Sequence, residues 1–252
     1  MGLRVEEAHV AGRDLSLWQR LAVGLIKPPL TVLTRRTWSG FEHVPQTGPV
    51  IIVANHISHA DTVAVAHFVY DSGRWPQFMI KSSVFKVPVV GYLMTKWTQI
   101  PVQRGSADAA RALEASLKVL EEGGSVVIYP EGTTTKEPDL WPMRGKTGAA
   151  RLALATGAPV IPLVTWGAQD IFDPRTKKKR IRPRMPVTLV AGPPVDLSKW
   201  AGQAPTSQVL NEMTTEIMNR LREMISEVRG EPAPPIWSPQ AAQQEPKVEE
   251  SS

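Results

Sequence analysis

The chain has 252 residues, 42% of them hydrophobic, which is enough to fill the core of one large domain. It contains no cysteine, which excludes disulfides, thiolate metal sites and a covalent thioester on the chain. Its 29 Lys and Arg residues exceed its 24 Asp and Glu residues. This balance favours an anionic partner such as nucleic acid, anionic lipid or a phosphorylated small molecule.

Residues 17–38 place an apolar helical face beside an aromatic and basic rim. We expect one helix, then two prolines that open a second short helix ending in two arginines. The residues of this pattern are Leu17, Trp18, Leu21, Leu25, Pro28, Pro29, Arg35 and Arg36. Such a combination is typical of a helix lying in the headgroup layer of a membrane. A helical pair packed on its own domain fits the pattern equally well.

Beyond this segment, short apolar runs alternate with helical patterns. Strands are expected at 49–55, 77–81, 98–102, 125–130, 158–167 and 185–195, and helices at 60–71, 106–124, 145–157 and 207–228. The alternation predicts a single layered α/β domain with a mostly parallel central sheet flanked by helices.

The same patterns divide the chain into three segments. We expect an N-terminal interfacial segment at 1–36, the α/β domain at 37–229 and a disordered Pro, Gln and Glu-rich tail at 230–252. No run reaches the roughly 18 apolar residues of a membrane span. The N-terminus also differs from a secretory signal, which favours a location inside the cell.

The stretch ANHISHADTV, at 54–63, concentrates polar groups where a strand turns into a helix. Ser58 and Asp61 fit a capping box, in which case His56 and His59 are ordinary loop histidines. Alternatively, Asp61 accepts a hydrogen bond from one imidazole, which fixes its tautomer and lets the other ring nitrogen take a proton. The stretch alone leaves both interpretations open.

Three later stretches favour the second interpretation. IPVQRG, at 100–105, ends a strand in Arg104 just before a helix start, where an anion is favoured. SVVIYPEGTTT, at 125–135, ends a strand in Glu131, followed by a glycine and three hydroxyls. RGKTG, at 144–148, brings two cations to the next helix start.

In order and spacing, His-x4-Asp, a strand ending in arginine and Pro-Glu-Gly-Thr resemble the motifs of the glycerophospholipid acyltransferase family, of the 1-acylglycerol-3-phosphate acyltransferase type. The resemblance covers about residues 36–195, including an apolar fourth motif, VIPLVTWG. It implies that His56 is the general base, that Asp61 orients it, and that Arg104 and Glu131 bind the acceptor.

The resemblance also implies a wider set of substrate-binding positions. These are Lys81, Arg104, Glu131, Gly132, Thr133, Thr134 and Lys146. One departure stands out, because relatives usually carry arginine where this chain has Thr134. The phosphate set is therefore one cation short, and Lys136, Arg144 or Lys146 is expected to replace it.

The implied reaction moves an acyl group from acyl-CoA or acyl-carrier protein to 1-acylglycerol 3-phosphate, giving phosphatidic acid without cofactor or metal. Glycerol 3-phosphate or another lysolipid or glycolipid is the alternative acceptor. The absence of a Gly-x-Ser-x-Gly elbow argues against a serine hydrolase. The resemblance and the interfacial segment together place the protein peripherally on the cytoplasmic face of the membrane.

Two other classes of protein remain as alternatives. One is a non-catalytic lipid-surface module. The other is a nucleic-acid binder, suggested by the basic run 175–184 but without a recognisable motif, so we expect no nucleic-acid partner. The run itself is expected to be a solvated loop or a contact for anionic lipid, CoA phosphates or an acidic carrier protein.

Overall fold

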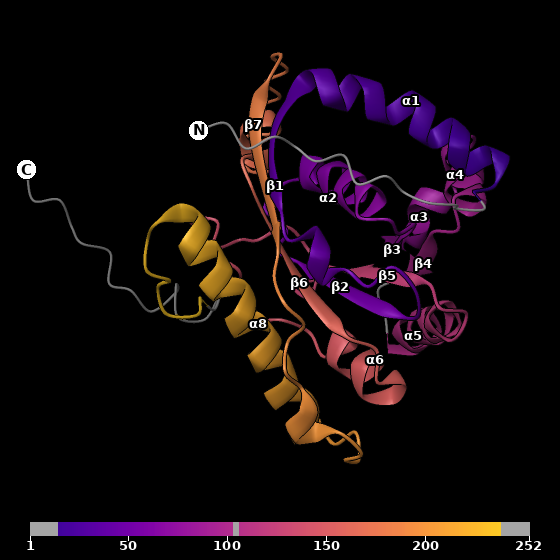
Figure 1. The fold of residues 1–252 in the computed structure, drawn as a ribbon, viewed down its shortest axis with the longest axis vertical. Helices are drawn as coiled ribbons and strands as arrows, with labels where there is room; N and C mark the ends of the chain where they lie inside the picture. The colour runs from indigo at the N-terminus through magenta and orange to yellow at the C-terminus, as the bar shows by residue number, and fades with distance from the viewer. Residues whose placement is uncertain (1–14, 103–105, 238–252) are drawn as a thin grey trace, which may run out of the picture.

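A seven-stranded sheet runs through the computed structural model, which describes residues 15–102 and 106–237 (Figure 1). The strands are β1 (Thr34–Ser39), β2 (Val50–Ala54), β3 (Pro76–Lys81), β4 (Ile100–Val102), β5 (Ser125–Ile128), β6 (Val160–Trp166) and β7 (Met185–Ala191). Their order across the sheet is β1-β7-β6-β2-β5-β3-β4. All neighbouring pairs are parallel except β6 and β7. The predicted mostly parallel α/β domain is confirmed.

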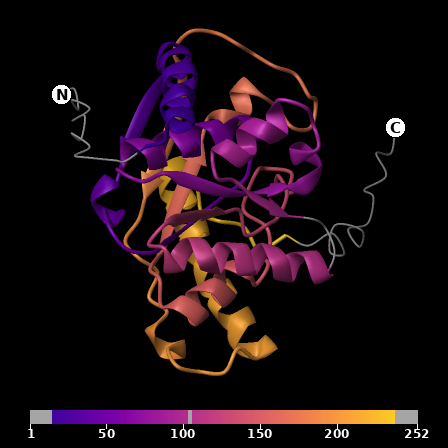
Figure 2. The ribbon, with the colours of Figure 1, turned by 90° about the vertical axis from the view of Figure 1, so that its right-hand side faces the viewer.

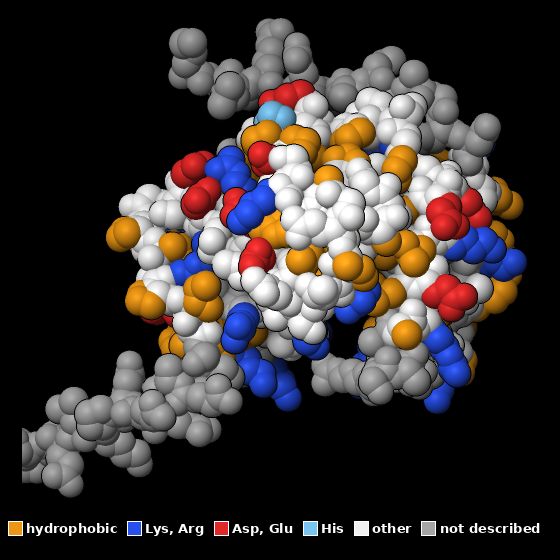
Figure 3. Space-filling view, turned by 90° about the horizontal axis from the view of Figure 1, so that it is seen from below, with side chains coloured by type: hydrophobic (Ala, Val, Ile, Leu, Met, Phe, Trp, Pro, Cys, Tyr) orange, Lys and Arg blue, Asp and Glu red, His pale blue; other side chains and the backbone are white. Residues whose placement is uncertain are grey.

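Helices cover both faces of this sheet (Figures 1 and 2). They are α1 (Leu17–Leu33), α2 (His59–Asp71), α3 (Ser82–Phe85), α4 (Val90–Lys96), α5 (Ser106–Glu121), α6 (Gly148–Thr156), α7 (Ala168–Ile171) and α8 (Ser207–Arg229), with single 3-10 turns η1 (Phe41–His43) and η2 (Ser198–Trp200). The view from below, away from α1, shows acidic, basic and apolar side chains mixed over one surface (Figure 3).

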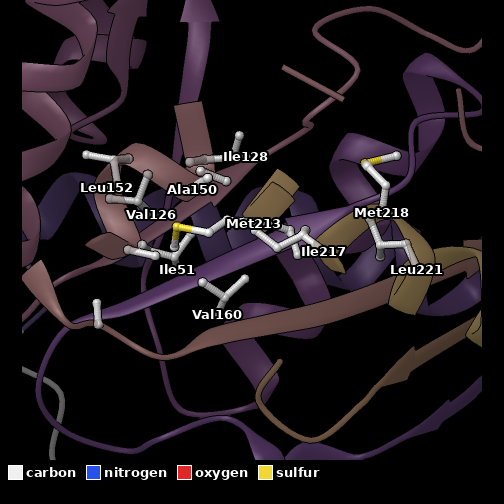
Figure 4. Close-up of a cluster of buried hydrophobic side chains, with 14 of the residues drawn as sticks. Ile51, Val126, Ile128, Ala150, Leu152, Val160, Met213, Ile217, Met218 and Leu221 are labelled. Atoms are coloured by element: carbon white, nitrogen blue, oxygen red, sulfur yellow. The ribbon is translucent and has the colours of Figure 1, made fainter. Parts of the chain in front are cut away.

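Two apolar clusters fill the space between the sheet and its helices. One joins β2 and β5 to α6 and α8 through residues such as Ile51, Val126, Leu152 and Met213 (Figure 4). The other packs α2 against the opposite face of the same strands, with Phe68 at its centre. Both β2 and β5 are covered on their two faces and are buried along their whole length. This burial explains why their sequences are continuous apolar runs.

The N-terminal segment differs from its prediction. Pro28 and Pro29 lie inside one continuous helix, α1, and do not open a second one. A proline removes the N–H that would bond four residues back, but Gly24 and Leu25, whose carbonyls lose their donors, lie on an exposed side of the helix. Solvent at that surface can satisfy both carbonyls.

Arg35 and Arg36 belong to β1, and the prediction of a helix there was wrong. The strand alternates half-buried and exposed residues, and it pairs in parallel with β7. Arg36 lies on the half-buried side, 3.6 Å from Asp71. The expected domain boundary between 36 and 37 falls inside this strand.

The structure describes residues 230–237, the first part of the tail expected at 230–252. The Arg222 guanidinium of α8 donates to the Pro234 carbonyl, so the chain after α8 turns back toward that helix. The expectation of disorder for residues 238–252 concerns positions outside the described residues.

Asn55 extends the pairing of β2 with β6 by one side chain. Its amide nitrogen donates to the Thr165 carbonyl at 3.0 Å, and its oxygen accepts from the Thr165 N–H at 2.8 Å. Asn55 is fully buried, so these two bonds replace a backbone ladder where the strand has already ended. They fix the residue that directly precedes His56.

We predict that Asn55→Ala lowers the free energy of unfolding by about 2 to 4 kcal/mol, because it strands a buried N–H and a buried C=O. Urea unfolding followed by circular dichroism measures the change. Asn211→Ala, at an exposed position of α8, is the control and should change stability by less than about 0.5 kcal/mol. Equal, small effects of both substitutions would show that the Asn55 bonds contribute nothing.

Candidate active site

The turn from β2 into α2 is organised around one buried carboxylate. Asp61 has no exposed surface, and its oxygens lie 2.9 and 3.1 Å from Nδ1 of His56. One of these oxygens also accepts the backbone N–H groups of Ile57 and Ser58, each at 2.8 Å. A carboxylate can only accept, so a neutral imidazole here presents Nδ1–H to Asp61 and has its lone pair on Nε2.

The capping box and the His56–Asp61 contact are both present in this turn. Ser58 caps α2, with its hydroxyl accepting from the N–H of Ala60 at 3.0 Å, and Asp61 completes the capping box. The same carboxylate orients His56. His59, the first residue of the helix, is exposed, and its ring lies 5.6 Å from that of Phe172. Only one of the two histidines therefore meets the carboxylate.

Tyr129 forms the floor beneath His56, a contact that the sequence did not reveal. The two rings stack with centroids 4.1 Å apart and planes inclined by 20°. Tyr129 follows β5, so its ring reaches the histidine from the neighbouring strand. Burial raises the pKa of the Tyr129 hydroxyl well above its usual value, and the Asp61 charge raises it further. The ring therefore remains neutral beside the imidazole.

The loop after β5 bonds both the backbone N–H and the backbone carbonyl of His56. The Glu131 carboxylate accepts the His56 N–H at 3.2 Å, and the Thr135 N–H donates to the His56 carbonyl at 2.7 Å. The second Glu131 oxygen accepts the N–H of Met143 at 3.0 Å. With only 4% of its surface exposed, Glu131 ties three chain segments together at the site.

Between these two attachment points lies the Gly-Thr-Thr segment. Gly132 has φ of +69°, and a side chain there would collide with the overlying Lys146 amine. Lys146 is itself held by its N–H, which donates to the Pro130 carbonyl at 2.8 Å. The N–H groups of Thr133 and Thr134 have no hydrogen-bond partner within the described ranges 15–102 and 106–237. They remain available to a ligand.

The structure brings together most, but not all, of the predicted site residues. His56, Asp61, Glu131, Gly132, Thr133, Thr134 and Lys146 converge around this loop. Lys81 is exposed at the end of β3, a strand that is separated from β2 by β5. The Lys136 N–H contacts the Met143 sulfur at 3.2 Å, which places Lys136 beside the segment that carries the exposed Arg144. Arg104 lies outside the described residues.

Comparisons with known proteins identify the family of this chain. The family model described as acyltransferase matches residues 35–166, more than half of the chain, and the chain belongs to this acyltransferase family.

The named relatives share part of their length with this chain. A chloroplastic 1-acyl-sn-glycerol-3-phosphate acyltransferase of Brassica napus is 31% identical over 135 residues, 53% of this chain and 38% of that protein. The enzyme of the same name from Borreliella burgdorferi is also 31% identical, over 53% of this chain and 52% of its own length. The chain thus spans about half or less of these two curated relatives. The Bacillus subtilis enzyme of this name is 26% identical over 73% of this chain and 84% of its own.

A solved structure shares the fold. The 1-acyl-sn-glycerophosphate acyltransferase PlsC from Thermotoga maritima superposes with a TM-score of 0.55 at 24% identity, covering 77% of this chain and 73% of that one. Within the described ranges, none of the helices combines the length and apolar character needed to cross a bilayer.

Burial raises the pKa of Glu131 to about 7, against the opposing effect of the Met143 and His56 N–H groups. Because the folded protein binds this proton more tightly than the unfolded chain, the resulting stability is complete below pH ~4.5 and is lost as pH rises through about 7. We predict that this group alone lowers the free energy of unfolding by up to about 3 kcal/mol across that window.

Glu131→Gln, which does not titrate, should lose this component of the pH dependence. The measurement is urea unfolding of both proteins at several pH values between 4.5 and 8. Parallel stability curves for the two proteins would contradict the assignment.

Proposed function

We propose that this acyltransferase uses His56 as its general base, with Asp61 as the residue that positions the ring. The supporting observation is the pairing of Nδ1 with a fully buried carboxylate, which directs the lone pair of Nε2 away from Asp61. His56 keeps 12% of its side chain exposed, so a substrate hydroxyl can approach it. Nε2 makes no hydrogen bond to any residue in the described part of the chain.

The proposed reaction is direct transfer. Nε2 takes the proton of an acceptor hydroxyl as its oxygen attacks the thioester carbonyl of acyl-CoA or acyl-carrier protein. The tetrahedral oxyanion then collapses, the C–S bond breaks, and His56 gives its proton to the departing sulfur, which leaves as the thiol. We assign the free N–H groups of Thr133 and Thr134 as the oxyanion donors, because their loop is fixed on His56 from both sides.

The proposed acceptor is 1-acylglycerol 3-phosphate, the substrate in the names of the relatives. The product is phosphatidic acid. Lys146, over Gly132, supplies a cation for the phosphate. An apolar cavity of about 110 Å³ between α1 and α2 has room for a few methylene groups of an acyl chain, and its lining includes Leu30, Val63 and Ala60, the residue before Asp61.

A different lysolipid or glycolipid acceptor is the second candidate. It is favoured by Thr134, which stands where the resemblance expects an arginine.

For a phosphorylated acceptor, we propose that Lys136, Arg144 and Lys146 take over the phosphate contact of that arginine, because they supply cations to the same loop region. Comparing turnover of lysophosphatidate with that of glycerol 3-phosphate and a neutral monoacylglycerol distinguishes the acceptors.

We predict that His56→Ala and Asp61→Asn each reduce turnover of lysophosphatidate and acyl-CoA by about 10² to 10⁴-fold, because proton removal then lacks a correctly oriented base. His59→Ala is the matched control and should retain most activity, since that ring does not meet Asp61. Circular dichroism verifies folding. A dead His59→Ala variant beside an active His56→Ala variant would reverse the assignment.

We also propose that α1 holds the enzyme on the membrane surface, on the cytoplasmic side. Leu17, Leu21 and Leu25 recur every four residues and are 68%, 54% and 74% exposed. The other side of α1 packs on the domain through Ala22, and Lys27 contacts Asp71 at 2.8 Å. The helix therefore lies on the domain with its apolar stripe facing outward, as in a helix at a lipid interface.

We predict that Leu21→Glu combined with Leu25→Glu weakens binding to phospholipid vesicles on the order of 100-fold, because two apolar insertions are lost. Vesicle flotation measures binding. Turnover of soluble short-chain substrates should persist. Ile236→Glu, an exposed apolar position far from α1 in sequence, is the control. Unchanged flotation of the double variant would refute a lipid-facing α1.

A further inference from the structure

A basic loop, defined here as residues 173–184, connects α7 to β7 and carries seven cations. They are Arg175, Lys177, Lys178, Lys179, Arg180, Arg182 and Arg184. All seven residues are exposed, as is Ile181, at 71% of its surface. The side chains of Lys177, Lys178 and Arg182 make no ion pair or hydrogen bond with any residue in 15–102 or 106–237. The acyl-transfer mechanism gives these three residues no role.

The basic loop is fixed between the candidate active site and α1. At one end, the Ser58 hydroxyl of the catalytic turn donates to the Phe172 carbonyl at 2.6 Å. At the other end, the Arg184 N–H donates to the Val32 carbonyl near the end of α1 at 3.2 Å. In Figure 2 the loop arches over the top of the molecule beside α1. The loop is thus fixed to the C-terminal end of α1, the helix that carries the apolar stripe in its N-terminal half.

The opposite flank of α1 extends the apolar surface. Trp18 meets the Tyr92 ring of α4 edge to face, with centroids 5.3 Å apart. Beside it, Val87, Val89 and Tyr92 are 48%, 71% and 52% exposed. Figure 1 shows α1 running along the top of the molecule, with the upper end of β7 near one end of the helix and α4 near the other.

We infer that the basic loop is the electrostatic half of a membrane-docking surface whose apolar half is α1 with α4, and that its partner is an anionic bilayer. The inference rests on the proposed function, in which the acceptor is a lipid. An apolar stripe flanked by unpaired cations matches the acyl boundary and anionic headgroups of a lipid surface. Ile181 among the cations favours lipid over an acidic carrier protein, because it can insert below the headgroups while the cations stay at their level.

The test is flotation at low salt with phosphatidylcholine vesicles and with the same vesicles containing phosphatidylglycerol. The variant Lys177→Gln, Lys178→Gln, Arg182→Gln should lose about 100-fold in affinity for the anionic vesicles, since each cation near such a surface contributes about fivefold. Its affinity for pure phosphatidylcholine should be unchanged. The exposed side chains leave the fold undisturbed when replaced.

The matched control removes three exposed cations elsewhere: Lys118→Gln, Arg151→Gln, Lys199→Gln, on α5, α6 and η2. It should bind anionic vesicles nearly as wild type does. Equal losses in both triple variants would overturn the inference in favour of a net-charge effect. Wild-type vesicle binding by the loop variant would overturn it as well, and a raised KM for acyl-carrier protein in that case would assign the loop to the carrier.

Vesicle binding is measured without turnover, so the two proposals fail separately. Loop-dependent binding to anionic vesicles by a chain that transfers no acyl group to any lysolipid would support the loop's role and overturn the proposed function. Acyl transfer from soluble substrates, with vesicle binding independent of the loop, would support the proposed function and overturn the loop's role.

Discussion

The carboxylate of Asp61 accepts the ring N–H of His56 and two backbone N–H groups while having no exposed surface. A buried carboxylate is tolerated only when hydrogen-bond donors replace its lost hydration, so the turn around it has little freedom. The backbone donors come from Ile57 and Ser58, between the histidine and the helix. One side chain therefore sets the path of the turn, the start of α2 and the orientation of the imidazole.

The rest of the architecture keeps that turn in place. Asn55, the residue before His56, is bonded to Thr165 of β6. Glu131 and Thr135, from the loop after β5, bond the backbone N–H and C=O of His56, and Tyr129 stacks on the His56 ring. All of these groups come from the carboxyl ends of adjacent strands. A parallel sheet brings such ends to one edge, which explains why groups of the candidate site that are distant in sequence meet here. Burial also explains why Glu131 serves the scaffold, since its oxygens are occupied by backbone donors.

Much of this arrangement could be predicted from the sequence. Apolar runs bounded by turns located β2, β5 and β6, and the Ser58 and Asp61 pattern located the start of α2. The prediction failed for residues 34–39, which were expected to end a helix and instead form a strand. The residues TRRTWS alternate with a period of two and form β1, whose inward Arg36 is held by Asp71, a partner that local sequence does not reveal. The stack of Tyr129 on His56 likewise depends on strand order.

We expect Asp61 to hold the neutral ring of His56 as the Nδ1–H tautomer, with a free Nε2. Nitrogen NMR of ¹⁵N-histidine-labelled protein, with His56 assigned by substitution, tests it at a pH where the ring is neutral. The account predicts a protonated Nδ1 and an unprotonated Nε2 in the wild-type protein, and loss of this preference in Asp61→Asn. A wild-type ring protonated at Nε2, or one whose tautomer ignores the Asp61 substitution, would contradict it.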